Sequence, residues 1–158
     1  MVTLSKTLSG AMAIAQRAGA ANAGAEHLMM AALAMDDGTA RQAFEAIGAD
    51  PDGFPMAVEA ALAAALPDLD MPELDQELMG ERAPMGVDLP LGTARMNVDA
   101  TFEAAIKATH YFHELPENGG RLCGAYFVAG IASIEHGVAA RALAEMRIEP
   151  AELISAAN

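Results

Sequence analysis

The stretch that decides the fold is DDGTARQAFEAIGADPDGF, residues 36–54, because the chain repeats its pattern 99 positions later as EHGVAARALAEMRIEPAEL, residues 135–153. Four pairs of residues are identical at this offset: Gly38 and Gly137, Ala40 and Ala139, Ala43 and Ala142, and Pro51 and Pro150. Large apolar residues also correspond between the two stretches, as Leu143 does to Phe44 and Met146 to Ile47. Such a repeat predicts one supersecondary unit present twice, with each copy covering the apolar side of the other.

Both copies have the apolar spacing of a helix. In each copy four apolar residues follow the i, i+3, i+4, i+7 pattern: Ala40, Ala43, Phe44 and Ile47, then Ala139, Ala142, Leu143 and Met146. No stretch alternates apolar and polar residues over the length of a strand, so we expect no sheet. The expected fold is all-α, with two pseudo-twofold-related four-helix repeats packed as one eight-helix domain.

The predicted repeats span residues 4–66 and 98–158. In the first helix, about residues 4–19, one apolar face is expected to hold Leu4, Leu8, Ala11, Met12, Ala15 and Ala18. In the second repeat, the helix over about 99–113 is expected to carry Phe102, Ala105, Ile106 and Thr109 on one face. The fourth helix is predicted to start at Asp50-Pro51, a side-chain cap followed by proline, and to become regular near Pro55.

A proline-rich connector, residues 67–97, separates the repeats. Proline at this density blocks a long helix. We interpret the segment as a surface connector. The alternative is an acidic, methionine-bearing flap over a groove, because long irregular loops in compact domains are often functional.

The bulk composition excludes several classes of function. A formal net charge of −13 argues against nucleic acid and anionic membranes, both of which need clustered Lys and Arg. The single cysteine, Cys123, permits no internal disulfide and no thiolate zinc cluster. The N-terminal apolar patch is interrupted by Ser9 and Gly10, and the late charge-free run from Leu122 to Ile134 is too short to span a bilayer. We therefore expect a cytoplasmic protein.

The repeated pattern resembles the Clp N-terminal repeat, which occurs twice in the N-terminal domain of Clp-type AAA+ unfoldases. The first copy carries the family's G-x-E-H-L as Gly24, Glu26, His27 and Leu28, and its I-G-x-D as Ile47, Gly48 and Asp50. The second copy carries G-V-A-x-R-x-L as Gly137, Val138, Ala139, Arg141 and Leu143. The ATPase motif G-x4-G-K-[ST] does not occur in the 158 residues, so we expect a free-standing domain of this kind.

The resemblance implies a non-catalytic module that binds peptide segments, an adaptor or a Clp ATPase, or a hydrophobic small molecule, in a groove where the repeats meet. Such a module could be an accessory to Clp substrate recognition or a decoy for it. In some family members the Glu of each E-H pair helps to dock phosphorylated arginine; here the second copy has Ala125 and Tyr126 instead. Glu26 and His27 are therefore either one such position or a structural pair at the start of a helix. The predicted binding residues are Glu26, His27, Phe102, Tyr111, Phe112 and Tyr126.

The alternative hypothesis is a small metal-dependent or thiol enzyme that uses His110, His113 and Cys123. Histidines three apart on a helix can bind a metal, but no second cluster in the sequence completes a ligand set. Cys123 has no neighbouring partner that would mark it as a nucleophile. We therefore expect no metal, no cofactor and no catalytic residue.

Overall fold

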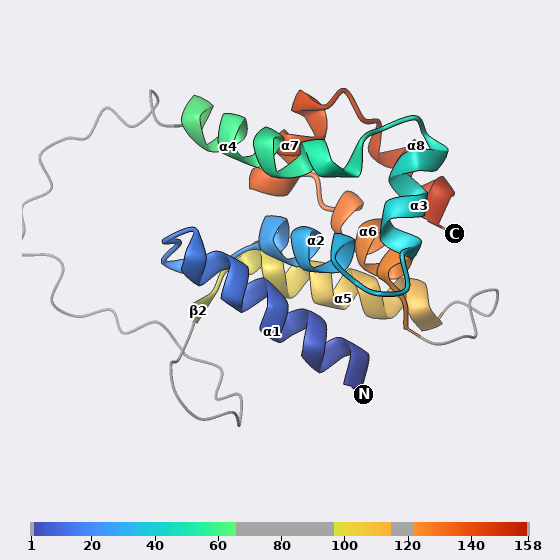
Figure 1. The fold of residues 1–158 in the computed structure, drawn as a ribbon, viewed down its shortest axis with the longest axis horizontal. Helices are drawn as coiled ribbons and strands as arrows, with labels where there is room; N and C mark the ends of the chain where they lie inside the picture. Colours follow the sequence, from blue (N-terminus) through green and yellow to red (C-terminus); the bar gives the residue numbers. More distant parts are fainter. Residues whose placement is uncertain (1, 66–96, 115–121, 158) are drawn as a thin grey trace, which may run out of the picture.

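The computed structural model describes residues 2–65, 97–114 and 122–157, and eight α-helices lie within these ranges (Figure 1). The helices of the first half are α1 (Val2–Arg17), α2 (Ala25–Leu33), α3 (Thr39–Ala46) and α4 (Phe54–Ala65). Those of the second half are α5 (Ala100–Glu114), α6 (Gly124–Ala132), α7 (Val138–Glu145) and α8 (Pro150–Ala157).

The predicted all-α fold of two four-helix repeats is confirmed. Both ends of α6 and α7 lie 99 positions after the ends of α2 and α3, as the offset between the two sequence stretches predicted. The limits of the repeats, 4–66 and 98–158, stay a prediction. Residues 67–96 of the connector lie outside the described residues, and so does the choice between a surface connector and a flap.

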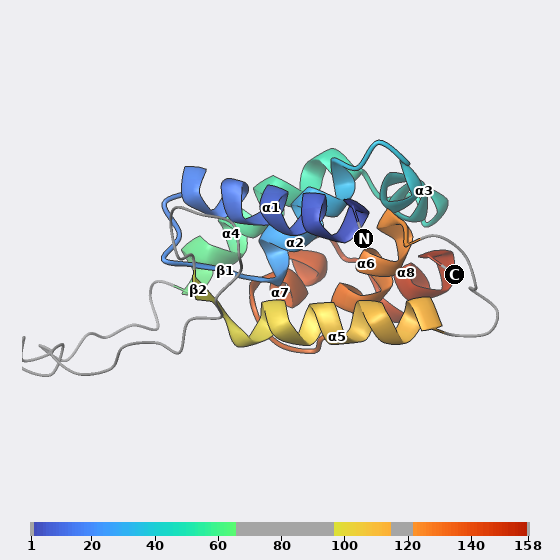
Figure 2. The ribbon, with the colours of Figure 1, turned by 90° about the horizontal axis from the view of Figure 1, so that it is seen from below.

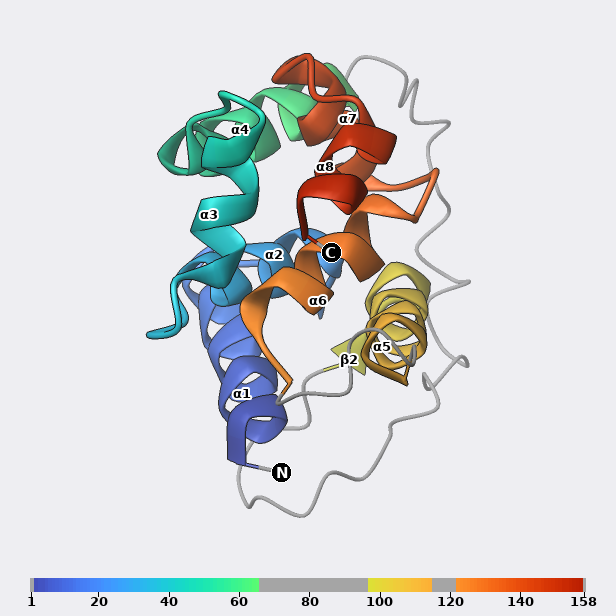
Figure 3. The same cartoon turned by 90° about the vertical axis from the view of Figure 1, so that its right-hand side faces the viewer.

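The two all-apolar helices, α2 and α6, pack against each other at the centre of the molecule. Helix α1 packs on α2 and α5 packs on α6, so that α1 and α5 lie on opposite sides of this pair (Figures 2 and 3). Helices α4 and α7 pack side by side over one edge of the pair (Figures 1 and 3). A helix that is apolar on every side requires this kind of enclosure.

The predicted faces of the outer helices are largely confirmed. Phe102, Ala105 and Thr109 are buried on α5, where Thr109 Oγ1 donates to the carbonyl of Ala105 at 2.7 Å. Helix α5 approaches α6 so closely that a Cβ atom added to Gly130 would lie 2.7 Å from the Thr109 backbone nitrogen. On α1 the predicted stripe is wrong at one position: Ala18 is exposed, because the helix ends at Arg17.

The start of α4 agrees with the sequence analysis. The Asp50 carboxylate accepts a hydrogen bond from the Asp52 backbone N–H at 3.0 Å, and Pro51–Gly53 form a 3₁₀ turn. The regular helix begins at Phe54, so Pro55 stands in the first turn, where a missing N–H costs no intrahelical bond.

The chain leaves α3 and α7 by the same type of turn. The residue after each helix cap has a positive φ, 73° at Gly48 and 57° at Arg147. In both turns the next backbone N–H donates to a carbonyl five residues earlier, at 2.9 Å, to Phe44 in the first half and Leu143 in the second. This is the Schellman arrangement, whose left-handed position normally holds glycine. The first half has glycine at this position, whereas the second has arginine.

Each central helix is completed at its N-terminus by the other half of the molecule. The backbone N–H of Gly124 donates to the Asp37 carboxylate, and that of Ala125 donates to Thr39 Oγ1, both at 3.0 Å. In the opposite direction, the Ala25 N–H donates to Thr101 Oγ1 at 3.1 Å. Three N–H groups that have no intrahelical partner are thus satisfied across the boundary between the halves.

One strand pair joins the halves as well. Strand β1 (Asn22–Ala23) pairs in parallel with β2 (Asn97–Val98), and the Asp99 N–H then donates to the Ala23 carbonyl at 3.0 Å. Two-residue strands are too short to show an alternating pattern, which explains why the sequence predicted no strand here.

Candidate binding groove

A groove of about 720 Å³ lies between α1 and the C-terminal end of α2. Its remaining wall is formed by the two residues that precede α6, so both halves of the molecule contribute to it. The lining residues are Lys6, Thr7, Gly10, Ala13, Ile14, Arg17, Ala31, Ala34, Met35, Asp36, Asp37, Leu122 and Cys123. The volume falls within the range of small-molecule and peptide side-chain sites.

Small side chains create this groove. A Cβ atom added to Gly10 would lie 3.6 Å from the Cβ of Ala31, so the two helices nearly touch at the floor. Ala13 and Ala34 line the walls without filling the space above. At one side Thr7 Oγ1 lies within 3.5 Å of the Met35 sulfur, to which it donates. Methionine adapts its shape to different apolar contacts, which suits a binding surface.

The charged groups at the rim differ in how they are paired. Lys6 Nζ lies 2.9 Å from Asp36 Oδ2, in an exposed ion pair. The hydrogen bond from Lys6, followed by the charge of its ammonium, holds the pKa of Asp36 below its usual value. Asp37 accepts hydrogen bonds from Gly124 and Thr39, so its carboxylate is already bonded to the first residues of α6 and α3. Arg17 lines the groove at the last turn of α1, and no described carboxylate forms an ion pair with it.

Glu26 and His27 lie outside this groove. Both are buried in the first turn of α2, with 6% and 5% of their surfaces exposed. His27 Nδ1 accepts a hydrogen bond from the Gly24 backbone N–H at 3.0 Å. Glu26 Oε1 lies 3.1 Å from His27 Nδ1. The imidazole therefore satisfies an N–H at the helix start, which is a structural task. The docking role of Glu26 stays a prediction.

Three of the predicted aromatic residues lie near the end of α5 and the start of α6. Tyr111 is 65% exposed, and its ring packs edge-on against Phe112, with ring centroids 5.6 Å apart. Tyr126 packs edge-on against His113, with centroids 5.8 Å apart. Burial, with a smaller effect from the nearby charge of Cys123, raises the pKa of Tyr126 above its usual value. Phe102 is a buried residue at the opposite end of α5, so the structure does not bring it together with the others.

The residues of the enzyme hypothesis do not form a metal centre in the described part of the chain. His110 is exposed and His113 contacts an aromatic ring, and no group of three His, Cys, Asp or Glu side chains there could hold a metal ion. Cys123 is a free, half-buried thiol that lines the groove.

Sequence reasoning missed most of the groove, because it searched for aromatic residues. The available signal was the spacing of small residues on two neighbouring helices, Gly10 with Ala13 and Ala31 with Ala34. A second signal was the charge of α1, which contains Lys6 and Arg17 and no acidic residue, in a chain with a net charge of −13.

Comparisons with known proteins found one similarity, in the first half of the chain. Residues 2–78 match the family model described as the Clp repeat (R) N-terminal domain. The comparison with curated proteins returned no match. Across the described ranges no helix is long and apolar enough to cross a membrane. The match covers the helices that form the floor and one wall of the groove, and it agrees with the G-x-E-H-L and I-G-x-D motifs of the first copy. Over residues 2–78 this chain is therefore similar to the Clp repeat (R) N-terminal domain.

Proposed function

We propose that the groove between α1 and α2 binds a short apolar peptide segment of a Clp substrate or adaptor. The observation that supports this most strongly is the groove itself, a space of about 720 Å³ with apolar walls in a chain that is similar to the Clp repeat N-terminal domain over residues 2–78. Concave, mostly apolar surfaces with a few polar groups at the rim are the usual form of a binding site. A cytoplasmic location, where Clp machinery works, is part of this proposal.

A filled groove tests the proposal directly. Ala13→Phe places a ring in the groove from α1, where Ala13 is half-buried, and should abolish the binding of apolar peptides, measured by fluorescence polarisation. Ala60→Phe makes the same change at an exposed position of α4, outside the groove, and should leave binding unchanged. Equal binding by the two variants would show that peptides bind elsewhere.

The same experiment examines the predicted binding residues. Tyr111→Ala removes the most exposed aromatic ring of that set without touching the groove lining. A loss of peptide affinity in this variant, with Ala13→Phe unaffected, would move the site to the end of α5. A hydrophobic small molecule that occupies the groove should compete with the peptide.

The role of the domain beside a Clp machine is a separate proposal. A decoy removes substrate or adaptor from the ATPase and should slow a Clp-dependent degradation reaction to which the chain is added. An accessory that delivers substrate should accelerate the reaction. The Ala13→Phe variant serves as the control in both cases, and rates that do not respond to the wild-type chain would contradict both roles.

A further inference from the structure

One wall of the groove comes from the other half of the molecule. Helices α1 and α2, with the residues that follow α2, form the floor and two walls, whereas Leu122 and Cys123 lie directly before α6. We call these two residues the α6 wall. The width of the groove therefore depends on where the start of α6 lies relative to the first half.

A single carboxylate from the first half is bonded to the start of α6. Asp37 Oδ2 accepts a hydrogen bond from the backbone N–H of Gly124 at 3.0 Å. Asp37 Oδ1 accepts hydrogen bonds from the backbone N–H and the hydroxyl of Thr39, at 3.0 and 2.9 Å. Cys123, the residue before α6, makes no side-chain hydrogen bond to the start of that helix within the described part of the chain. The first half thus provides the cap that α6 does not supply itself.

The start of α6 also packs closely against the start of α3. A Cβ atom added to Gly124 would lie 3.0 Å from the Cβ of Ala40 and 3.2 Å from Asp37 Oδ1. Glycine permits this approach because it has no side chain. A larger residue would have to move its neighbours by a few tenths of an ångström, and the α6 wall, which is next in the chain, would move with them.

We propose that Asp37 is a positioning residue of the groove, which fixes the α6 wall against the first half so that ligand affinity depends on the bond to Gly124. A binding site loses affinity when a wall is displaced by about half an ångström, because the fit to the ligand is lost. This inference rests on the proposed function, since it concerns how the same groove is held in shape.

The reactivity of Cys123, the single cysteine of the chain, reports the position of the α6 wall without a ligand. Asp37→Ala removes the acceptor from Gly124, so the half-buried thiol should react about fivefold faster with the disulfide reagent DTNB, the effect of losing one helix cap. Asp50→Ala is the matched control, because it removes a carboxylate that caps the turn before α4, outside the groove. It should lower the overall stability by a similar amount, yet Cys123 should react more slowly than in Asp37→Ala. Equal rates in the two variants would contradict the proposal.

Peptide affinity tests the consequence for the ligand. Fluorescence polarisation with the fluorescein-labelled amide of Gly-Gly-Leu-Ala-Leu-Leu should show about fivefold weaker binding to Asp37→Ala than to wild type, and unchanged binding to Asp50→Ala. Asp37 itself lines the groove, so a second variant must act from outside the lining. Gly124→Ala moves the α6 wall without changing a lining residue and should also weaken binding. Gly53→Ala, whose added Cβ atom would lie at an ordinary 3.6 Å from Met146, should not weaken it.

The possible failures of the two proposals can be told apart. If Ala13→Phe abolishes binding but Asp37→Ala and Asp50→Ala bind the peptide equally, the groove is the peptide site and the positioning role of Asp37 is wrong. The positioning role is also wrong if Gly124→Ala binds the peptide as wild type does. If binding does not depend on Ala13, the groove is not the peptide site and both proposals fail.

Discussion

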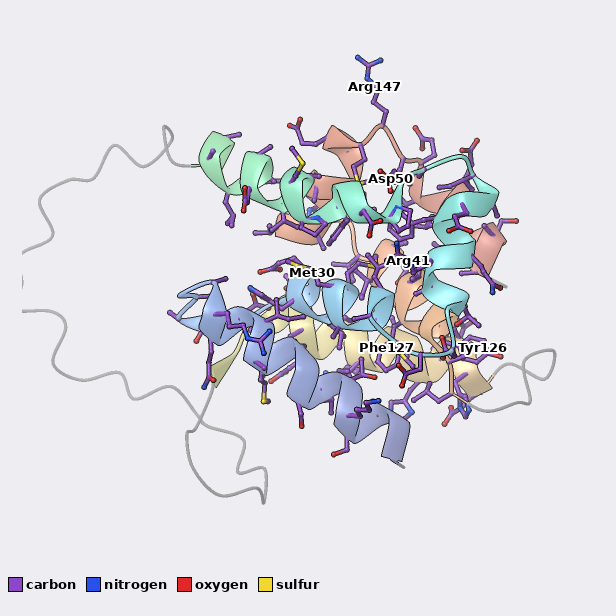
Figure 4. The ribbon with its side chains drawn as sticks, viewed as in Figure 1. Met30, Arg41, Asp50, Tyr126, Phe127 and Arg147 are labelled. Carbon is purple, nitrogen blue, oxygen red and sulfur yellow. The ribbon has the colours of Figure 1, made fainter. Side chains whose placement is uncertain are left out.

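Replacing Arg147 by glycine should stabilise this protein, although it removes a charged side chain. Arg147 has a φ of 57°, in the left-handed region, and its side chain points away from the helices into solvent (Figure 4). A residue with a Cβ atom loses about 1–2 kcal/mol in this conformation. Glycine relieves that strain, but it also raises the conformational entropy of the unfolded chain, which lowers the gain in stability by about 0.4–1 kcal/mol. The net effect on the free energy of unfolding should be an increase of about 0.5–1 kcal/mol.

Urea denaturation measures this change. The midpoint should rise at an unchanged slope, and the melting temperature should increase by about 2–4 °C per kcal/mol for a chain of this size. Arg147→Ala is the matched control: it removes the same charge and keeps the Cβ atom, so it should not stabilise the protein. Gly48→Ala introduces the strain at the equivalent turn of the first half, where φ is 73°, and should destabilise it. If Arg147→Ala stabilises the protein as much as Arg147→Gly, the effect comes from charge and the strain argument is refuted.

Three further predictions follow from contacts between elements. Gly130→Ala should lower the free energy of unfolding by about 1–3 kcal/mol, because its methyl group would meet the Thr109 backbone, and a circular dichroism melt that is unchanged would contradict the close approach. Thr101→Val keeps the side-chain shape but leaves the first N–H of α2 without its acceptor, so denaturation should show a loss of about 1 kcal/mol; a neutral result would mean that this bond contributes nothing. Because burial raises the pKa of Tyr126, its hydroxyl loses the proton at a lower pH in the unfolded chain than in the folded one. The stability that the protonated hydroxyl contributes should therefore decline as the pH rises past about 10. In the Tyr111→Phe variant, which leaves one tyrosine, phenolate absorbance should appear at higher pH in the native than in the urea-unfolded chain, and the reverse order would contradict the prediction.

Much of the fold could be predicted because the information is local and present twice. The stripe that begins at Ala40 has a helical period, and its copy 99 positions later predicts the same helices again. Turn chemistry at Asp50 and Pro51 placed the start of the fourth helix. The left-handed conformation of Arg147 could be inferred only from its alignment with Gly48, since arginine itself carries no signal for a positive φ.

The candidate groove was less predictable than the fold, since it depends on how separate segments meet. Ala13 and Ala34 have no functional signature as single residues, and Cys123 comes from the other half of the chain. Sequence patterns mark side chains that are present, whereas this groove arises where large side chains are missing between two packed helices. The aromatic residues were predicted to bind a ligand because of their residue type, yet Phe102 belongs to the buried core.

The exchange of N–H acceptors between the halves shows that the duplicated units are no longer interchangeable. The first half supplies a carboxylate and a hydroxyl, Asp37 and Thr39, to α6, whereas the corresponding positions of the second half hold His136 and Val138. The second half instead supplies Thr101 from a different helix. A homodimer assembled from two second halves would place Val138 opposite an amide that needs an acceptor, so the N-terminus of α6 would lose a hydrogen bond that the first half now supplies.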